Sequence, residues 1–262
     1  MILSASIRAA SLWGPGLEGW DASVPILAGH APYVPAPSPP PAPSLLPPAE
    51  RRRAGPVIRL ALAVAHEAAT RSGLPPASLD AVFASSNGDG PVVGSILEAL
   101  ATDTDARVVS PTQFHNSVHN AAAGYWSIAM ASRRPATCIG CHDESWAAAL
   151  LTAFAGLRTS GEPVLLVCYD HPLPPPLDKV RFTGPAFGAA LVLTSASQGP
   201  TLTLNYRPEA HPRPNALDSC FAALAPNPAA RALPLLAALA QQAPLTLDLA
   251  YQDGSIELEL RP

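Results

Sequence analysis

Residues 147–157 (AAALLTAFAGL), the turn Gly161-Glu162-Pro163 and residues 164–169 (VLLVCY) form the stretch that decides the fold class. The first run is apolar and rich in alanine, which favours a helix, and the glycine and proline that follow end it. The second run is apolar throughout and does not alternate, which is typical of a central strand of a parallel sheet. A helix followed by a buried strand indicates a layered α/β fold.

Further strands and helices alternate on both sides of this stretch. A helix of about 15 residues begins near Val57 and ends before Gly73. The remaining predicted elements are a strand followed by a loop at 1–20, a strand at 79–85, helices at 92–101 and 120–131, a strand after Pro135, a helix beginning near Ser145, strands at 189–194 and 201–206, and a proline-punctuated helical region at 222–241. The chain ends with a predicted β-hairpin, in which residues 245–251 pair with 255–260 across Gln252-Asp253-Gly254.

The composition fits one domain that contains an irregular segment. The chain has 262 residues, of which 48% are apolar and 32 are prolines. Nine of these prolines lie in residues 32–48, so the rest of the chain can form regular structure. We expect residues 1–262 to form a single domain, with the proline-rich segment 32–48 extended on its surface.

The charge balance excludes several classes of protein. Sixteen basic residues against twenty acidic ones give a net charge of −4, which leaves no basic surface for nucleic acid. No apolar run reaches the ~20 residues that a membrane span requires. Four cysteines in a chain of this length do not indicate a disulfide framework. We therefore expect a cytoplasmic protein without a membrane span.

The motif Cys138-Ile-Gly-Cys141-His142 matches the pattern for attachment of c-type haem. Zinc is a second interpretation, with His115 and His119 as additional ligands, although a structural zinc site usually has two pairs of ligands. A third interpretation is structural: small residues in a turn between a strand and a helix. We expect no metal and no cofactor, and a metal or haem protein that uses Cys138 and Cys141 is the weaker alternative.

Residues 110–127 carry two histidines, several amides and three aromatic side chains. Such a group could perform acid–base chemistry. The structural alternative is that Asn116 and Ser117 cap the start of a helix, while residues 121–124 allow this helix to pack closely.

Several motifs together resemble the N-terminal half of β-ketoacyl synthases. Asn120 follows Ser110-Pro111 by ten residues, and Pro135, a strand, a tight turn and an alanine-rich helix come next. The matching segments are residues 13–20 (WGPGLEGW), 51–53 (RRR), 82–88 (VFASSNG), 110–127 and 163–170. The chain is most similar to the ketosynthase-like chain length factors of aryl polyene clusters. This resemblance implies an α/β, thiolase-like layered fold that is truncated in its C-terminal half and ends in the β-hairpin.

The resemblance also implies where a nucleophile would lie. In ketosynthases a cysteine occupies the sharp turn between the strand after Pro135 and the following helix, where the helix N-terminus lowers its pKa. Alignment places Asp143 or Glu144 at that position, and neither is a cysteine. The two histidines of the ketosynthase C-terminal half have no counterpart motif after residue 170. The chain therefore resembles a noncatalytic relative of ketosynthases.

Two hypotheses for the function follow. The first is a chain length factor that forms a heterodimer with a catalytic ketosynthase and meets an acyl carrier protein only indirectly. It would act in aryl polyene, polyketide or fatty-acid-type elongation, with Thr112, Gln113 and Phe114 lining the partner's acyl tunnel. The structural motif implied by the resemblance comprises Ser110, Pro111, Asn116, Asn120 and Gly124. The second hypothesis is a condensing enzyme or acyltransferase that uses Cys141 with His115, His119 or His142.

Overall fold

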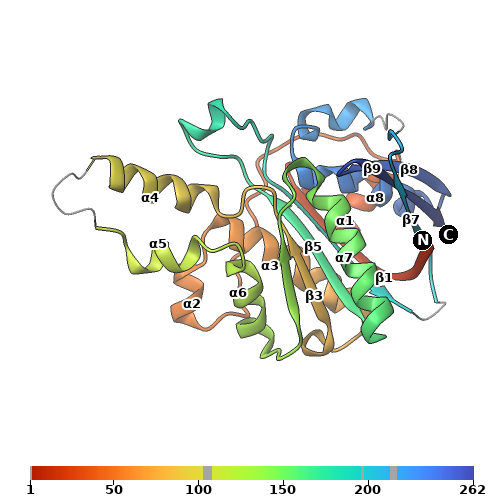
Figure 1. Ribbon diagram of the computed structural model, residues 1–262, viewed down its shortest axis with the longest axis horizontal. Coiled ribbons are helices and arrows are strands. Elements are labelled where there is room, and N and C mark those ends of the chain that lie inside the picture. The colour runs from red at the N-terminus through yellow and green to blue at the C-terminus, as the bar shows by residue number, and fades with distance from the viewer. Residues whose placement is uncertain (1, 103–107, 196–197, 213–216) are drawn as a thin grey trace.

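A mixed β-sheet runs through the molecule, and helices cover both of its faces (Figure 1). The computed structural model describes residues 2–102, 108–195, 198–212 and 217–262. The strands are β1 (Ile2–Gly14), β2 (Leu17–Glu18), β3 (Asp80–Ala84), β4 (Ala136–Ile139), β5 (Val164–Asp170), β6 (Phe187–Thr194), β7 (Thr201–Pro208), β8 (Leu245–Tyr251) and β9 (Gly254–Arg261). The α-helices are α1 (Trp20–Leu27), α2 (Pro48–Arg53), α3 (Pro56–Ser72), α4 (Gly90–Thr102), α5 (Pro111–Asn116), α6 (Ala121–Met130), α7 (Ser145–Ser160) and α8 (Leu233–Gln241). Short 3-10 turns are η1 (Pro76–Ser78), η2 (His142–Glu144), η3 (Leu177–Lys179), η4 (Ser219–Leu224) and η5 (Pro228–Ala232).

The strands of the described residues form one sheet in the order β4-β3-β5-β6-β1-β7-β9-β8, with β2 paired to β1. Strand β3 runs parallel to both β4 and β5, whereas β5 and β6 are antiparallel. The predicted central strand is therefore parallel on one side only, because the chain returns from β5 to β6 through a loop without a crossover α-helix. Strands β8 and β9 pair antiparallel, which confirms the predicted C-terminal hairpin.

Two apolar cores lie on opposite faces of this sheet. One is formed against α3 and α6, and the other against α7, η5 and α8. Strand β5 contributes to both, with Leu165 and Val167 in the first core and Leu166 and Cys168 in the second. This explains why its sequence does not alternate between apolar and polar residues. Within the described residues, no helix is both long enough and apolar enough to cross a membrane.

The region 222–241 differs from the predicted helical stretch. Only α8 is an α-helix there, and the preceding residues form the 3-10 turns η4 and η5. Pro226 and Pro228 lack the N–H groups that a continuous helix requires, which accounts for the interruption. At the N-terminus, the Gly14-Pro15-Gly16 turn returns the chain as β2, which lies within the predicted loop, and α1 follows in a stretch for which the sequence predicted no element.

The proline-rich segment contains no helix or strand between residues 32 and 47. The Trp13 Nε1–H group donates a hydrogen bond to the Ser38 carbonyl at 2.8 Å. Arg51 donates to the carbonyls of Ser44 and Leu46, and the Leu46 side chain is buried. The segment is thus attached to the folded body at both its middle and its end.

A buried carboxylate at the end of β5 positions the loop that follows β3. Asp170 is fully buried, and its Oδ1 accepts hydrogen bonds from Ser85 Oγ at 2.9 Å, Ser86 N at 2.8 Å and Asn87 N at 3.3 Å. Ser85 Oγ in turn accepts a bond from Gly88 N at 2.9 Å. Burial raises the pKa of Asp170 to about 7, against the opposing effect of these hydrogen bonds and of Arg181.

Replacing Asp170 with asparagine tests this arrangement. The pKa of Asp170 is higher in the folded state than in the unfolded state. Between about pH 4 and 7 the folded state therefore binds more protons than the unfolded state, and the free energy of unfolding falls as pH rises through this range. The free energy of unfolding is measured in urea at pH 4.5 and at pH 7.5. We expect its decrease between these two pH values to be about 1–3 kcal/mol smaller in Asp170→Asn than in the unmodified protein. Asp253→Asn, in the exposed β8–β9 turn, is the control. An unchanged pH dependence in Asp170→Asn would contradict the assignment.

Candidate functional site

The turn between β4 and α7 is sharp and is held by its own backbone and by one serine. Ser145, the buried first residue of α7, accepts a hydrogen bond from Cys141 N at 3.0 Å and donates one to the His142 carbonyl at 2.7 Å. His142 has a φ of 48°, a left-handed conformation that is uncommon for a residue other than glycine. The turn therefore places Asp143 and Glu144 directly before the N-terminus of α7.

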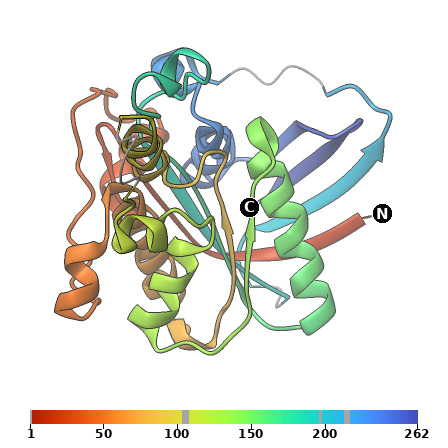
Figure 2. The same cartoon turned by 60° about the vertical axis from the view of Figure 1, so that its left-hand side comes forward.

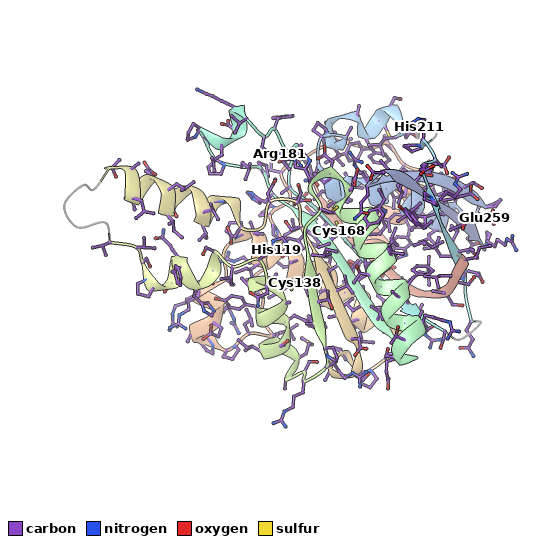
Figure 3. All side chains as sticks on the ribbon, viewed as in Figure 1. His119, Cys138, Cys168, Arg181, His211 and Glu259 are labelled. Atoms are coloured by element: carbon purple, nitrogen blue, oxygen red, sulfur yellow. The ribbon has the colours of Figure 1, made fainter. Side chains whose placement is uncertain are left out.

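Asp143 is paired with an arginine from the loop between β5 and β6. Its Oδ1 lies 2.6 Å from Arg181 Nη2, which also donates to Ser86 Oγ at 2.7 Å. Arg231 approaches the other carboxylate oxygen at 4.0 Å. Figure 3 shows Arg181 in that loop, beyond the end of β5 that carries Cys168. Asp143 thus belongs to a network that includes the loop positioned by Asp170.

This pairing keeps Asp143 negatively charged. Partial burial acts to raise its pKa, but the hydrogen bond and charge of Arg181, assisted by Arg231 and His142, hold the pKa below its usual value. The N-terminus of α7 also favours a negative charge at this position. An anion here would repel the oxyanion that forms when a thioester is attacked. Asp143 is therefore held in an ion pair at the start of α7.

Glu144 has a different contact. Its Oε2 accepts a hydrogen bond from Gln252 N at 2.8 Å, so it connects the β4–α7 turn to the turn of the C-terminal hairpin. The thiol of Cys141 also lies 3.9 Å from this oxygen. Asp143 and Glu144 both lie on the turn, as the alignment expected, and their correspondence to a catalytic cysteine stays a prediction.

Cys141 is poorly prepared to act as a nucleophile. Burial first, and the neighbouring Glu144 carboxylate second, raise the pKa of its thiol. His119 packs against the same turn: a Cβ added to Gly140 would lie 3.2 Å from its Cε1 atom. His115 contacts the ring of Tyr125 edge-on, with centroids 6.2 Å apart. Among the described residues, no hydrogen bond joins Cys141 to an imidazole.

The other cysteine of the motif lies in β4. Cys138 is half-buried, and burial raises the pKa of its thiol. In the part of the chain that the structure describes, no three His, Cys, Asp or Glu side chains gather in a way that could hold a metal ion. Figure 3 shows His119 and Cys138 in the same central region of the molecule.

The segment that begins at Ser110 forms α5 and exposes two of the predicted tunnel residues. Ser110 caps α5 by accepting a hydrogen bond from Gln113 N at 3.5 Å, and Pro111 follows as its first residue. Gln113 Nε2 donates to Ser95 Oγ of α4 at 2.9 Å. Thr112 is exposed, and Phe114 is 69% exposed. The tunnel assignment of Thr112, Gln113 and Phe114 stays a prediction.

Asn116 and Ser117 do not cap the start of a helix, contrary to the structural alternative. Asn116 is the last residue of α5 and is buried, where its Nδ2 donates to the Arg53 carbonyl at 2.9 Å and its Oδ1 accepts from Tyr125 Oη at 3.1 Å. It therefore joins α5 to α2 and α6. Asn120 is the N-cap residue of α6 but makes no side-chain capping bond.

Gly124 does not contribute to the close packing that was expected of residues 121–124. A Cβ added to it would meet no atom within 4 Å, and the residue is exposed. Ala122 and Ala123 are the members of this stretch that are buried in the core against α3. Gly124 therefore lies on the outer side of α6.

Sequence reasoning missed the residues that hold Asp143 in place. Arg181 lies in a proline-rich loop without periodicity, and its partners Ser86 and Asn87 come about 95 residues earlier. The position of Asp170 could have been predicted from the sequence. A carboxylate that directly follows a fully apolar buried strand lies at the carboxyl end of that strand, beside the loops that connect the strands.

Comparison with known proteins identifies the family. Residues 28–251 match the model of the family described as "Beta-ketoacyl synthase, N-terminal domain". No curated protein matches the chain. Three similar solved structures show the fold, and all are under 25% identical to this chain.

The first is the complex of the ketosynthase ApeO with its chain length factor ApeC from Xenorhabdus doucetiae (TM-score 0.73, 21% identity, 99% of this chain and 100% of that one). The second is the ishigamide ketosynthase/chain length factor (TM-score 0.68, 15% identity, 98% of both chains). The third is AntDE:AntF, a type II polyketide acyl carrier protein in complex with its ketosynthase (TM-score 0.74, 12% identity, 100% and 99%). With the family model matching most of its length, and with this mixed α/β, thiolase-like fold, the chain belongs to the β-ketoacyl synthase N-terminal domain family.

Proposed function

We propose that this protein is a noncatalytic ketosynthase-like subunit, a chain length factor, which pairs with a catalytic β-ketoacyl synthase and shapes its acyl tunnel. The observation that carries the proposal is the Asp143–Arg181 ion pair on the β4–α7 turn. This turn keeps the sharp geometry before a long helix that would suit a nucleophile. The side chain on this turn is instead the Asp143 carboxylate, which pairs with Arg181. We therefore propose that this subunit contributes shape and contacts and that the partner performs the chemistry.

The sheet offers an edge at which a partner could bind. Strand β4 is the last strand of the described sheet, and Ala136 and Thr137 are exposed on it. Beside it, α6 exposes Gly124 and Ile128, the latter to 48%. An uncharged edge strand flanked by exposed apolar residues is a surface that proteins normally cover. We propose that the ketosynthase partner covers β4 and the outer side of α6.

The similar structures support this kind of partner. Two of them are ketosynthase and chain length factor assemblies, and a third contains an acyl carrier protein bound to its ketosynthase. We propose that the carrier protein delivers the growing chain to the partner ketosynthase and meets this subunit only indirectly. The pathway would be an aryl polyene, polyketide or fatty-acid-type elongation, in keeping with the resemblance of the sequence.

Residues of α5 are placed to limit the length of the product in this arrangement. Helix α5 precedes α6 in the chain and is joined to it by the hydrogen bond from Tyr125 to Asn116, and we propose that it continues the partner face. The Gln113 side chain is held by Ser95, whereas Phe114 is exposed and free to enter a space supplied by the partner. A bulky ring at the end of a tunnel would stop elongation by excluding further carbon atoms.

Assembly with a ketosynthase is tested by placing charge on the proposed face. Gly124→Arg introduces a side chain that meets no atom of this chain within 4 Å at its Cβ. It also replaces glycine inside a helix, which favours the folded state by up to about 1 kcal/mol. We expect the variant to stay folded and to lose about tenfold or more in affinity for a co-expressed ketosynthase, measured by size-exclusion chromatography.

Gly156→Arg on α7 is the matched control, because a Cβ there also meets nothing within 4 Å. It should co-elute with the ketosynthase as the unmodified chain does. Loss of the complex in both variants, or in neither, would show that the partner does not bind over α6.

The catalytic alternative makes an opposite prediction for Cys141. If the chain is noncatalytic, Cys141→Ala in the complex leaves the product yield unchanged, and the isolated chain gains no acyl mass when it is incubated with an acyl thioester. If the chain is a condensing enzyme, Cys141 becomes acylated stoichiometrically and Cys141→Ala abolishes product. Intact-mass spectrometry and product quantification distinguish the two.

The tunnel assignment predicts a graded effect at position 114. In the reconstituted complex, Phe114→Ala should shift products toward longer chains and Phe114→Trp toward shorter ones, as read by mass spectrometry of the products. Phe182→Ala is the control, because Phe182 is exposed to 70%, as Phe114 is to 69%, but lies in the β5–β6 loop. An identical product distribution across the series would refute the role of Phe114.

A further inference from the structure

A cavity lies beneath the proline-rich segment and shares no residue with the β4–α7 turn. It has a volume of about 320 Å³ and is bounded by the end of β1, helices α3 and α6, and residues 41–45. Figure 2 shows the segment running along the outer side of the molecule, on the left of the view, down to α2. The apolar lining includes Trp13, Leu45, Leu62, Trp126 and Met130.

Residues 41–45 of the proline-rich segment cover this cavity, and the chain is attached to the folded body both before and after them. Before them, Ser38 accepts hydrogen bonds from Trp13 Nε1 at 2.8 Å and, through its hydroxyl, from Gly16 N at 3.1 Å. After them, Leu46 is buried and Arg51 donates to its carbonyl at 2.9 Å. The prolines between these points have no N–H group to bond elsewhere. The cavity is therefore a built feature between two attachment points.

Two glutamates line the cavity: Glu18 of β2, which is exposed, and Glu67 of α3. Glu67 of α3 accepts a hydrogen bond from Trp20 N at 2.6 Å and another from Ser11 Oγ at 2.5 Å, one at each oxygen. Gly19 lies against it, and a Cβ at this position would come within 2.9 Å of Glu67 Oε1. The φ of Gly19 is 86°, which other residues rarely adopt. The backbone is thus shaped around the carboxylate.

No cation within the described residues forms an ion pair with Glu67. Its donors are a hydroxyl and a backbone N–H, which are both neutral. His66 also lines the cavity, but burial lowers the pKa of its imidazole, so it is uncharged at neutral pH. The lining of the cavity therefore combines two carboxylates, two tryptophans and an apolar wall, and none of its residues is a lysine or an arginine.

We propose that this cavity binds a small organic ammonium ion with an apolar or aromatic group. The ammonium group would donate to the free lone pairs of Glu67, and the half-buried indole of Trp13 suits a cation because its ring face is electronegative. The apolar part would fill the space against Leu62 and Met130. The low polarity of the walls strengthens the charge interaction relative to water. The argument for this site does not rest on the proposed function, because none of its residues belongs to the turn or to β4; α6 is the element that it shares with the proposed partner face.

The test uses 2-phenylethylammonium as the probe, with the full-length protein. Its binding is followed by quenching of tryptophan fluorescence and by the rise in Tm, up to about 10 mM probe. Neutral 2-phenylethanol and anionic 3-phenylpropionate have a similar shape and different charges. We expect the ammonium ion to bind at least about tenfold more tightly than the alcohol, and the anion not to bind.

Two variants locate the binding. Glu67→Gln should weaken binding of the ammonium ion about tenfold and reduce its advantage over the alcohol, although Glu18 still lines the cavity. Ala63→Leu keeps the carboxylate and fills the cavity from α3, so it should abolish binding, while Ala155→Leu on the exposed side of α7 should have no effect. The proposal is overturned if the probe does not bind, if the alcohol binds equally well, or if Ala63→Leu binds as the unmodified chain does.

Discussion

The loops at the end of β5 depend on one contact, the buried carboxylate of Asp170. It lies at the end of β5, a strand whose residues are all buried, and accepts hydrogen bonds from three donors of the loop after β3. That loop presents Ser86 and Asn87 to Arg181, and Arg181 in turn holds Asp143. A chain of hydrogen bonds thus leads from the core to the turn before α7. Because buried polar groups are costly when unpaired, each link requires the next.

The turn between β4 and α7 shows how one geometry can serve two purposes. A sharp turn with a left-handed residue and a long helix behind it can lower the pKa of a thiol and expose it for attack. Here the same helix end favours the anion of Asp143, which Arg181 neutralises, and Glu144 accepts a bond from the hairpin turn at Gln252. With Asp143 and Glu144 at the turn, a geometry that could support a nucleophile instead binds the loop of Arg181 and the turn of the C-terminal hairpin.

The sequence predicted the elements that depend on local pattern and missed those that depend on distant contacts. Helix α7, strand β5 and the final hairpin follow from apolar runs and turn residues. The composition of residues 222–241 favours a helix, but Pro226 and Pro228 interrupt it, so that 3-10 turns precede α8. The role of Asn116 could not be read from its neighbours, because its partner carbonyl belongs to Arg53, 63 residues earlier. Arg181 was missed for the same reason, since nothing in its loop indicates an inward side chain.

Helix α6 lies between the two surfaces to which we assign partners. Trp126, Ala129 and Met130 line the cavity, whereas Gly124 and Ile128 face outward beside β4. The helix has ten residues and no side-chain hydrogen bond at its N-cap, so packing contributes most of its stability. A ligand in the cavity and a protein on the outer side would therefore both act on the order of the same helix. Since linkage is reciprocal, whatever one occupant does to the affinity of the other, the second does equally to the first.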